Sequence, residues 1–304
     1  MSGLERPKIL VIGELNVDIV ATGLRSAPEM GTEILAGDCE LTLGSASAIF
    51  AAGMAKLGHS VTFVSQVGRD YFGDFCVRTL QHLGVSTRHV TRKAEEKTGV
   101  TIALSGKHDR ALVTYAGAVA TFKADSIDET MISKHDHLHL TSYYLQTGLR
   151  PSFANLFRQA KSSGLTTSFD PNSDPRDKWD RNIDSVLNYT DVLFVNEREA
   201  MKLTRSNTTN DALKTLGTKV NCAVVKRGAH GATAIQNEKL FNTHDEHLSI
   251  HRAAKYRFVY STLFLLTHPC RWAVVSNVQR SRKFHSTAMD RASRIVAAWR
   301  PPME

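Results

Sequence analysis

Short apolar runs alternate with helix-like segments along most of the first 240 residues, and this alternation restricts the possible folds more than any other feature. The first run, residues 8–13, ends in glycine, and a segment rich in Ala, Met and Leu at 46–57 stops at Gly58. Strands separated by helices of this length form right-handed βαβ units. We therefore predict an α/β fold with a mainly parallel sheet and helices on both faces. The predicted strands are 8–13, 59–65, 137–141, 166–169, 191–195 and 222–226, and the predicted helices are 46–57, 71–83, 151–163, 197–203 and 211–216.

Two stretches break the alternation. Residues 18–43 and 98–115 are β-like without an intervening helix, and a turn at 106–110 joins two runs of the second stretch. Two apolar runs joined by a short glycine-containing turn are typical of a hairpin. We predict that these stretches form a small separate sheet over one end of the main sheet.

Composition divides the chain near residue 240. The protein carries 38 Lys and Arg against 30 Asp and Glu, a net charge of +8. Residues 241–304 hold ten of the basic and four of the acidic side chains, and they contain none of the 19 glycines. This C-terminal segment is therefore an atypical, basic and glycine-free tail.

Several classes of protein are disfavoured. No apolar run approaches the ~18 residues that a membrane span requires, and residues 1–7 lack the apolar core of a secretory signal. The four cysteines lie far apart without a Cys-x-x-Cys pair, which is typical of reduced thiols. We expect a cytoplasmic protein with no membrane partner.

Polar residues follow five of the predicted strands. Ligands bind at the carboxyl ends of the strands in an open α/β sheet, so these positions are candidates for a binding site. Asp, Asn and Gly also favour helix caps and turns, which is the alternative interpretation of each residue taken singly. Together they favour a polar cleft. The residues are Asn16, Asp18, Gly68, Asp70, Asp170, Asn172, Asn196, Glu199, Gly228 and Gly231.

Three common nucleotide and hydrolase motifs are absent. The sequence has no Gly-x-x-x-x-Gly-Lys-Ser/Thr loop, no Gly-x-Gly-x-x-Gly after the first strand, and no Gly-x-Ser-x-Gly. His135, His137 and His139 have a spacing that suits metal ligands, but no cysteine or acidic cluster completes a shell. We favour strand histidines over a metal site.

Seven motifs in order resemble the ribokinase-like (PfkB) family of carbohydrate kinases, from about residue 8 to about residue 234. Each motif alone is weak evidence for the family, whereas seven motifs in the family's order are specific evidence. They are GELNVD at 13–18, the glycine-containing loop and helix at 43–58, VGRDYFG at 67–73, TGV at 98–100, SFDPN at 168–172, VNEREA at 195–200 and VVKRGAHGA at 224–232.

The resemblance implies a kinase domain at residues 1–240 with a β lid built from parts of 14–43 and 98–116. It also implies ATP-dependent phosphorylation of a sugar or sugar-like hydroxyl, with Mg²⁺ and a sugar or nucleoside as the small-molecule partner. Phosphoryl transfer depends on positioning and charge neutralisation more than on covalent chemistry, so a polar cleft suits it. The resemblance also allows this chain to form a homodimer through the lid.

Site residues follow from the same resemblance. The implied substrate-binding residues are Asn16, Asp18, Gly44, Ser45 and Asn172, and the implied ATP-binding residues are Asn196, Glu199, Lys226, Gly228 and Gly231. Glu199 is also the implied magnesium residue, acting through bound water, because Mg²⁺ keeps much of its water shell. Two departures bear on the substrate: Ile49 stands where the family carries an asparagine, and Asp174 where several members carry an arginine. Ribokinase-type or keto-acid-type specificity is therefore not carried over.

One family motif is missing. A Gly-Ala-Gly-Asp loop in the C-terminal quarter supplies the family's anion hole and the aspartate that accepts the proton of the attacking hydroxyl. The 304 residues contain no Gly-x-Gly-Asp, and no glycine follows Gly231. We assign no catalytic residue, and a non-catalytic sugar- or nucleotide-binding protein with the kinase fold is the alternative function.

The tail admits three interpretations. The abrupt change in composition favours a shifted reading frame from about residue 241. A divergent but genuine C-terminal element is the second. A nucleic-acid-binding tail is the third, and it is disfavoured because ten basic residues over 64 positions form a dilute patch without a binding motif.

Overall fold

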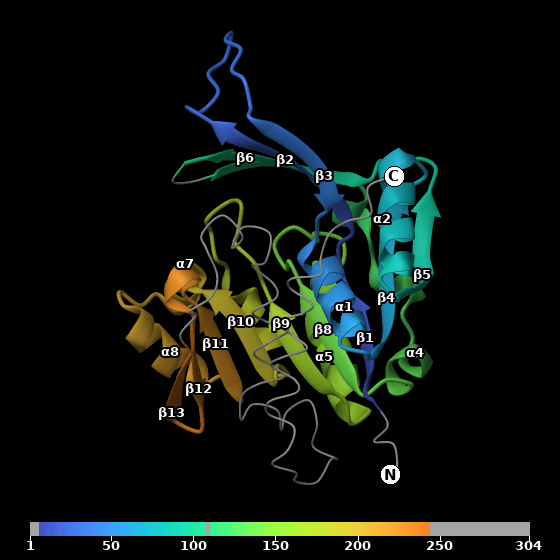
Figure 1. Ribbon diagram of the computed structural model, residues 1–304. Coiled ribbons are helices and arrows are strands. Elements are labelled where there is room, and N and C mark those ends of the chain that lie inside the picture. Colours follow the sequence, from blue (N-terminus) through green and yellow to red (C-terminus); the bar gives the residue numbers. More distant parts are fainter. Residues whose placement is uncertain (1–5, 108–109, 244–304) are drawn as a thin grey trace.

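The computed structural model describes residues 6–107 and 110–243, and the predicted change at residue 241 therefore lies almost entirely outside the described residues. Within them, a main sheet of nine strands has the order β13-β12-β11-β10-β9-β8-β1-β4-β5 (Figure 1). The strands from β5 to β11 are parallel, and β12 and β13 are antiparallel to their neighbours. Their bounds are β1 (Lys8–Ile12), β4 (Ser60–Gly68), β5 (Ser86–Lys93), β8 (His137–Thr141), β9 (Thr166–Asp170), β10 (Val192–Asn196), β11 (Cys222–Lys226), β12 (Ala232–Gln236) and β13 (Lys239–Thr243).

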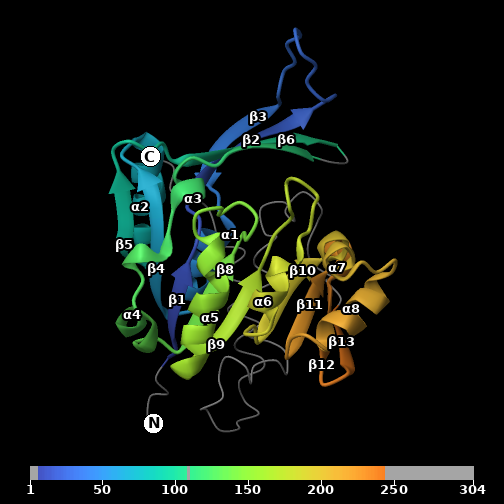
Figure 2. The same ribbon diagram turned by 180° about the vertical axis from the view of Figure 1, so that it is seen from behind.

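A second sheet forms the predicted lid. Its order is β3-β2-β6-β7, from β2 (Asn16–Leu24), β3 (Asp38–Leu43), β6 (Gly99–Gly106) and β7 (Arg110–Tyr115). Only three residues separate β1 from β2, so the lid begins directly at the carboxyl end of a central strand. Figures 1 and 2 show the lid above that edge of the main sheet. The prediction of a small separate sheet is confirmed.

Helices cover both faces of the main sheet, as the alternation predicts. Successive residues of β10 point to opposite faces: Val192 and Phe194 pack in one apolar cluster, and Leu193 and Val195 in the other. The two faces are seen in Figures 1 and 2. The first cluster holds α1 (Ala46–Lys56) and α2 (Tyr71–His82), and the second holds α4 (Glu129–Ser133), α5 (Phe153–Ser162), α6 (Asp184–Leu187), α7 (Glu197–Thr204) and α8 (Thr209–Gly217).

The α1 side of β10, β11 and β12 carries apolar side chains that are at most 2% exposed, in a cluster that extends beyond the strands on which the described helices of that side pack. α1 and α2 pack on β1, β4, β5 and β8. The apolar side chains of the neighbouring strands belong to the same cluster, yet within residues 6–107 and 110–243 the only helices in it are α1 and α2. These side chains are Val192, Phe194, Cys222, Val224, Ala232 and Ala234.

Among the helices of residues 6–107 and 110–243, none has the length and apolar character that a bilayer span requires.

Candidate active site

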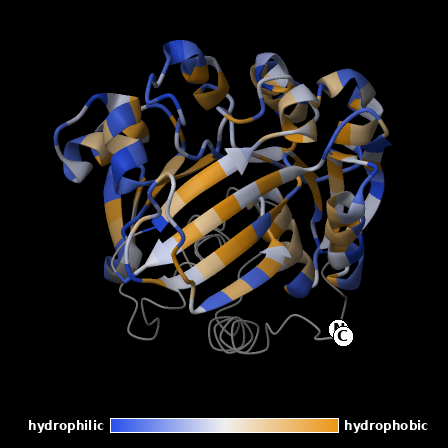
Figure 3. Ribbon diagram, turned by 90° about the horizontal axis from the view of Figure 1, so that it is seen from above, coloured by the Kyte–Doolittle hydropathy of each residue, from blue (hydrophilic) through white to orange (hydrophobic). Residues whose placement is uncertain are grey.

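The parallel strands bring the predicted site residues to one edge of the sheet, below the lid. Asn16, Asp18, Gly44 and Ser45 lie where β1 continues into β2 and where α1 begins. Asn196 and Lys226 end the neighbouring strands β10 and β11, which are paired in register at these two residues. Figure 3 shows the lid from above, lying across this edge. The topology therefore brings these positions to the same edge of the main sheet.

Asn16 and Asp18 form a hydrogen-bonded pair under the lid. Asn16 Nδ2 donates to Asp18 Oδ1 at 3.2 Å and to Thr101 Oγ1 of β6 at 3.4 Å. The backbone N–H of Gly44 donates to the carbonyl of Asn16 at 3.0 Å. A Cβ atom at residue 44 would lie 2.1 Å from Asp18 Oδ1, so only glycine fits against this carboxyl group. The loop before α1 and the first lid strand are thus closely packed.

Burial perturbs the acidity of Asp18. Removal from water raises the pKa of Asp18 to about 6, although the charge of Arg110 and the hydrogen bond from Asn16 act in the opposite direction. Desolvation disfavours the charged form of a carboxyl group, and strongly shifted groups in a cleft are typical of functional sites. Asp18 is therefore ionised at neutral pH but protonated in mildly acidic solution.

Ser45 and Asn172 both adopt left-handed backbone conformations, with φ of 71° and 55°. The Ser45 hydroxyl caps α1 by accepting from the N–H of Ala48 at 3.1 Å, and it donates to the carbonyl of Glu14. Asn172 Nδ2 donates to Ser142 Oγ at 2.6 Å. Non-glycine residues in this conformation are uncommon and concentrate at functional sites.

Asn196 and Glu199 form a capping box at the start of α7. Asn196 Oδ1 accepts from the N–H of Glu199, and Glu199 Oε2 accepts from the N–H of Asn196, both at 2.8 Å. Ser173 Oγ donates to Glu199 Oε1 at 2.8 Å. Because Ser173 follows Asn172 directly, the loop after β9 carries a predicted sugar residue and also contacts the start of α7.

The oxygen atoms of Asn196 and Glu199 are of the type that Mg²⁺ prefers. Both oxygens of the buried Glu199 carboxylate already accept hydrogen bonds. Among the described residues, no three His, Cys, Asp or Glu side chains are grouped so as to enclose a metal ion. The site therefore fits an ion that retains its water shell, and it does not fit an ion held by protein atoms alone.

Lys226 is held in place by the acidic residue that ends β9, Asp170. Its Nζ atom lies 2.7 Å from Asp170 Oδ2, and both side chains are at most one-tenth exposed. This ion pair joins the ends of β9 and β11 across β10. Beyond it, Gly228 and Gly231 adopt positive φ at the turn into β12, and a Cβ atom at Gly228 would meet open space. Among the described residues, nothing therefore lies within 4 Å of the position that a side chain at residue 228 would occupy.

The three histidines His135, His137 and His139 are each hydrogen-bonded to neighbouring protein groups. His137 Nε2 and His139 Nδ1 both lie 2.7 Å from Ser168 Oγ, and the His139 ring stacks on Phe50. Complete burial lowers the pKa of His137 to about 4, so this ring is neutral at physiological pH. His135 likewise bonds to Thr62 and to the carbonyl of Met131. These side chains are polar members of the core.

Sequence reasoning gave no role to three residues that the geometry places among the site residues. Glu14, Ser142 and Thr101 all bond to the predicted substrate residues or to their immediate partners. Glu14 stands inside the GELNVD motif, so its position was visible in the sequence. Ser142 and Thr101 carry no local signal, because only the pairing of β8 and β6 with distant strands brings them here.

Comparison with known sequences identifies a family. The sequence model of the pfkB family carbohydrate kinase matches residues 6–256, further along the chain than the last of the seven motifs. The ATP-dependent ribose-1-phosphate kinase of Halopiger xanaduensis is 30% identical over 197 residues, which cover 64% of this chain and 64% of that protein. The match to this relative therefore spans slightly less than two thirds of its length.

Solved structures of low sequence identity share the fold. The ribokinase of Arabidopsis thaliana complexed with ribose and ATP is 19% identical, with a TM-score of 0.71 over 94% of this chain and 99% of that chain. A structure from E. coli in complex with ATP and Mg²⁺ is 21% identical, with a TM-score of 0.72 over 95% and 99% of the two chains. The ribokinase-like α/β fold predicted from the motifs is thus confirmed.

Proposed function

Because this chain belongs to the pfkB family of carbohydrate kinases, we propose that it binds a sugar and ATP and transfers the terminal phosphoryl group of ATP to a sugar hydroxyl. One observation carries the proposal. The half-buried carboxyl group of Asp18, near the start of the lid strand β2, lies at the same edge of the main sheet as the Asn196–Glu199 capping box at the end of β10. A polar site with an acidic group at one end and a helix start at the other suits a polyhydroxy acceptor beside a phosphate donor.

On the sugar side, Asp18 and Asn16 bind hydroxyl groups, and Gly44 lets the ligand approach the backbone. Ser45 acts through its backbone, since its hydroxyl caps α1. Asn172 reaches the sugar from the end of β9. In the reaction, the sugar oxygen attacks the terminal phosphorus, the bond to the bridging oxygen breaks, ADP leaves and the hydroxyl proton is released. These residues orient the attacking hydroxyl and exclude water from it.

On the nucleotide side, Lys226 neutralises phosphate charge, and Gly228 and Gly231 leave space for the nucleotide. Glu199 and Asn196 would hold Mg²⁺ through its bound waters, and the ion would neutralise charge on the transferred phosphoryl group. The E. coli relative in complex with ATP and Mg²⁺ supports this cofactor pair. The donor chemistry of the capping box supports the same assignment.

The direct test is ATP consumption with a panel of acceptors. D-ribose, D-fructose, ribose 1-phosphate and adenosine are each added to the purified chain with ATP and Mg²⁺, and ADP is measured. Acceptor-dependent ADP release above the acceptor-free rate supports the proposal. Absence of both turnover and saturable sugar binding, measured by calorimetry, would contradict it.

A second function is favoured by one observation on the sequence. The 304 residues contain no Gly-x-Gly-Asp, so the chain lacks the family's anion hole and base and would bind sugar or nucleotide without turnover. Saturable binding of a sugar and of ATP without ADP release would establish this alternative. The same calorimetric and ADP measurements therefore separate the two functions.

Replacing Gly44 by alanine is expected to weaken sugar binding by about tenfold or more. The new methyl group would lie 2.1 Å from Asp18 Oδ1 and 2.7 Å from Asn16 Nδ2, so both side chains must move. Gly37→Ala is the matched control, because its methyl group would find its nearest neighbour at 3.5 Å, an ordinary contact. Calorimetric titration of the sugar measures both variants. Equal sugar affinities of Gly44→Ala and the wild type would show that Gly44 does not belong to the sugar site.

We also propose a homodimer through the lid. Ile102 and Val113 are paired across β6 and β7, so they share one face with Tyr115, and these side chains are 40%, 59% and 55% exposed. Figure 3 shows apolar and polar residues alternating along the lid strands. Exposed apolar patches mark interaction surfaces. Light scattering should report a dimer for the wild type and a monomer for the double variant Ile102→Lys/Val113→Lys. The control is Leu240→Lys, which replaces a β13 side chain that is 50% exposed, and it should remain a dimer. A monomeric wild type would contradict the proposal.

We further propose a cytoplasmic location. Cys39 is an exposed free thiol and Cys76 a buried one. An exposed thiol persists in a reducing compartment, which supports the cytoplasm. Localisation of a tagged chain by microscopy and fractionation tests this assignment.

A further inference from the structure

Glu14 is a buried acidic residue that the proposed reaction does not use. It lies in the three-residue connection between β1 and β2 and is 3% exposed. Its Oε1 atom accepts from the N–H of Ala46 at 2.8 Å and from Ser142 Oγ at 2.7 Å. Its Oε2 atom accepts from Ser47 Oγ at 2.7 Å and from Thr141 Oγ1 at 2.8 Å. A fifth donor, the N–H of Ser47, lies at 3.3 Å from Oε1.

These donors come from separate segments of the chain. Ala46 and Ser47 belong to the first turn of α1, directly after Gly44 and Ser45, whereas Thr141 ends β8 and Ser142 follows it. Ser142 in turn accepts from Asn172 Nδ2 at 2.6 Å. Glu14 is therefore joined to both loops that carry the predicted sugar ligands. A carboxylate at the N-terminus of a helix is also favoured by the helix dipole.

Backbone conformation marks the same place. Ser45, Ser142 and Asn172 have φ of 71°, 52° and 55°, and each is bonded to Glu14 or to a direct partner of Glu14. Non-glycine residues in the left-handed region are costly and persist where the surrounding structure holds them. The backbone carbonyl of Glu14 accepts a hydrogen bond from Ser45, and its carboxylate accepts one from Ser142. Ser142 in turn holds Asn172.

We propose that Glu14 is a positioning residue for sugar binding, which fixes the loop before α1 and the loop after β9 in one arrangement. The proposal rests on the proposed sugar-binding function. Glu14 itself does not contact the sugar, because both of its carboxylate oxygens are fully engaged with Ala46, Ser47, Thr141 and Ser142. The ATP side depends instead on the capping box and on the Asp170–Lys226 ion pair.

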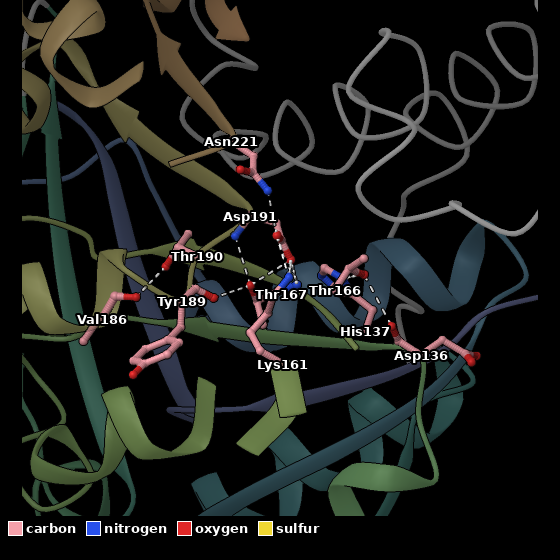
Figure 4. A network of polar contacts seen from close by, with 10 residues as sticks. All are labelled: Asp136, His137, Lys161, Thr166, Thr167, Val186, Tyr189, Thr190, Asp191 and Asn221. Atoms are coloured by element: carbon pink, nitrogen blue, oxygen red, sulfur yellow. Dashed lines mark hydrogen bonds and ion pairs between the residues drawn. The ribbon is translucent and has the colours of Figure 1, made fainter. Parts of the chain in front are cut away.

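The chain offers a matched control at the opposite edge of the sheet. Asp191, just before β10, is 5% exposed and also accepts hydrogen bonds from several segments: from the N–H of Thr167 at 2.8 Å, from Asn221 Nδ2 at 2.9 Å, and from Lys161 in an ion pair (Figure 4). Asp191→Asn therefore removes a comparable buried charge far from the site. It should lower thermal stability without changing either affinity.

The test compares Glu14→Gln, Ser142→Ala and Asp191→Asn in the full chain. In Glu14→Gln, D-ribose or D-fructose affinity should fall by about tenfold or more, as expected when a hydrogen bond to a charged group is lost, and ATP affinity should be unchanged. Ser142→Ala removes the hydroxyl that bonds both to Glu14 and to Asn172, and it leaves the bonds of Glu14 to Ala46, Ser47 and Thr141 in place. It should therefore lower sugar affinity and leave ATP affinity unchanged. Equal loss of sugar and ATP affinity in Glu14→Gln, or loss of sugar affinity in Asp191→Asn, would overturn the proposal.

Hydrogen exchange without ligand keeps this test independent of the proposed function. Glu14→Gln should accelerate amide exchange at residues 44–47 and 170–173, Ser142→Ala at 170–173 alone, and Asp191→Asn at 166–168. If the wild type binds no sugar, the proposed function fails, whereas faster exchange at both loops of Glu14→Gln still supports the positioning. Unchanged exchange at 44–47 and 170–173 in Glu14→Gln would refute it, even if the sugar binds the wild type.

Discussion

Replacing Asp18 by asparagine is expected to weaken sugar binding by about 10- to 100-fold at pH 7.5, because a hydrogen bond to a charged acceptor contributes about 1.5–3 kcal/mol. Asp18 lies under the lid against Gly44 and Asn16, so a neutral amide of the same shape fits the same space. Calorimetry of the sugar measures the loss. Asp38→Asn, an exposed residue at the start of β3, is the control and should bind as the wild type does.

The same substitution should stabilise the fold above pH 6. Burial raises the pKa of Asp18 from 3.8 to about 6, so the folded state retains a proton that the unfolded chain has lost. Stability therefore falls as pH rises from about 4 to 6, by on the order of 2–3 kcal/mol. Asp18→Asn avoids this loss, and its melting temperature should exceed that of the wild type by about 5 °C at pH 7.5 but not at pH 4.

Sugar binding by the wild type should show the opposite trend to its stability. Below pH 6 the protonated Asp18 loses acceptor capacity, so affinity should fall about tenfold between pH 7.5 and pH 5. Asp18→Asn should show no such dependence. Wild-type affinity that is constant over this range, or an Asp18→Asn variant that is less stable at pH 7.5, would show that Asp18 is not the ionised ligand of the sugar.

The second large effect concerns residues 241–304, for which we propose a shifted reading frame. Substituting a segment that contains Gly-Ala-Gly-Asp and its following helices should raise turnover by about 10⁴-fold or more. A positioned base supplies about 10²–10⁴-fold, and anion-hole donors supply about 10²–10³-fold. Such helices would also pack on the α1 side of β10, β11 and β12, where the apolar side chains are at most 2% exposed. Loss of that packing would expose apolar area and favour aggregation.

The measurements for this prediction are ADP release and size-exclusion chromatography. The control is the same chimaera with its loop aspartate replaced by asparagine, which should regain solubility but not turnover. Reading all three frames of the DNA downstream of codon 240 tests the frame directly. A monodisperse 304-residue chain with a cooperative melt and family-like turnover would contradict the proposal.

The parts of the fold that the sequence could predict are those with a strong local signal. The buried parallel strands are continuous apolar runs, and α1 and α2 have a cap at the start, Ser45 and Asp70, and a glycine after the end. The edge strand β5 was missed because its sequence, STRHVTRK, has no apolar run. α4 and α6 were missed because helices of five and four residues are too short to show a periodicity.

The site followed the same rule. Positions at or just after strand ends, such as Asn196 and Asn172, could be predicted to lie at one edge of the sheet because parallel strands point the same way. Partners contributed by distant strands were not found: the Asp170–Lys226 ion pair and the Ser142–Asn172 hydrogen bond depend on the spatial order of β8, β9 and β11. Local sequence pattern carries no information on such pairings, because they are set by the packing of the whole sheet.

The strand order of the main sheet also bears on how the chain is made. β1 lies inside the sheet, β4 and β5 extend it to one side, and β8 to β13 extend it to the other, each beside its predecessor. A polypeptide leaves the ribosome at about 5–20 residues per second, so every new strand meets an edge that earlier strands have already formed. The residues around Asp18 are therefore translated before Lys226, and residues 244–304 are translated only after every described strand of the sheet.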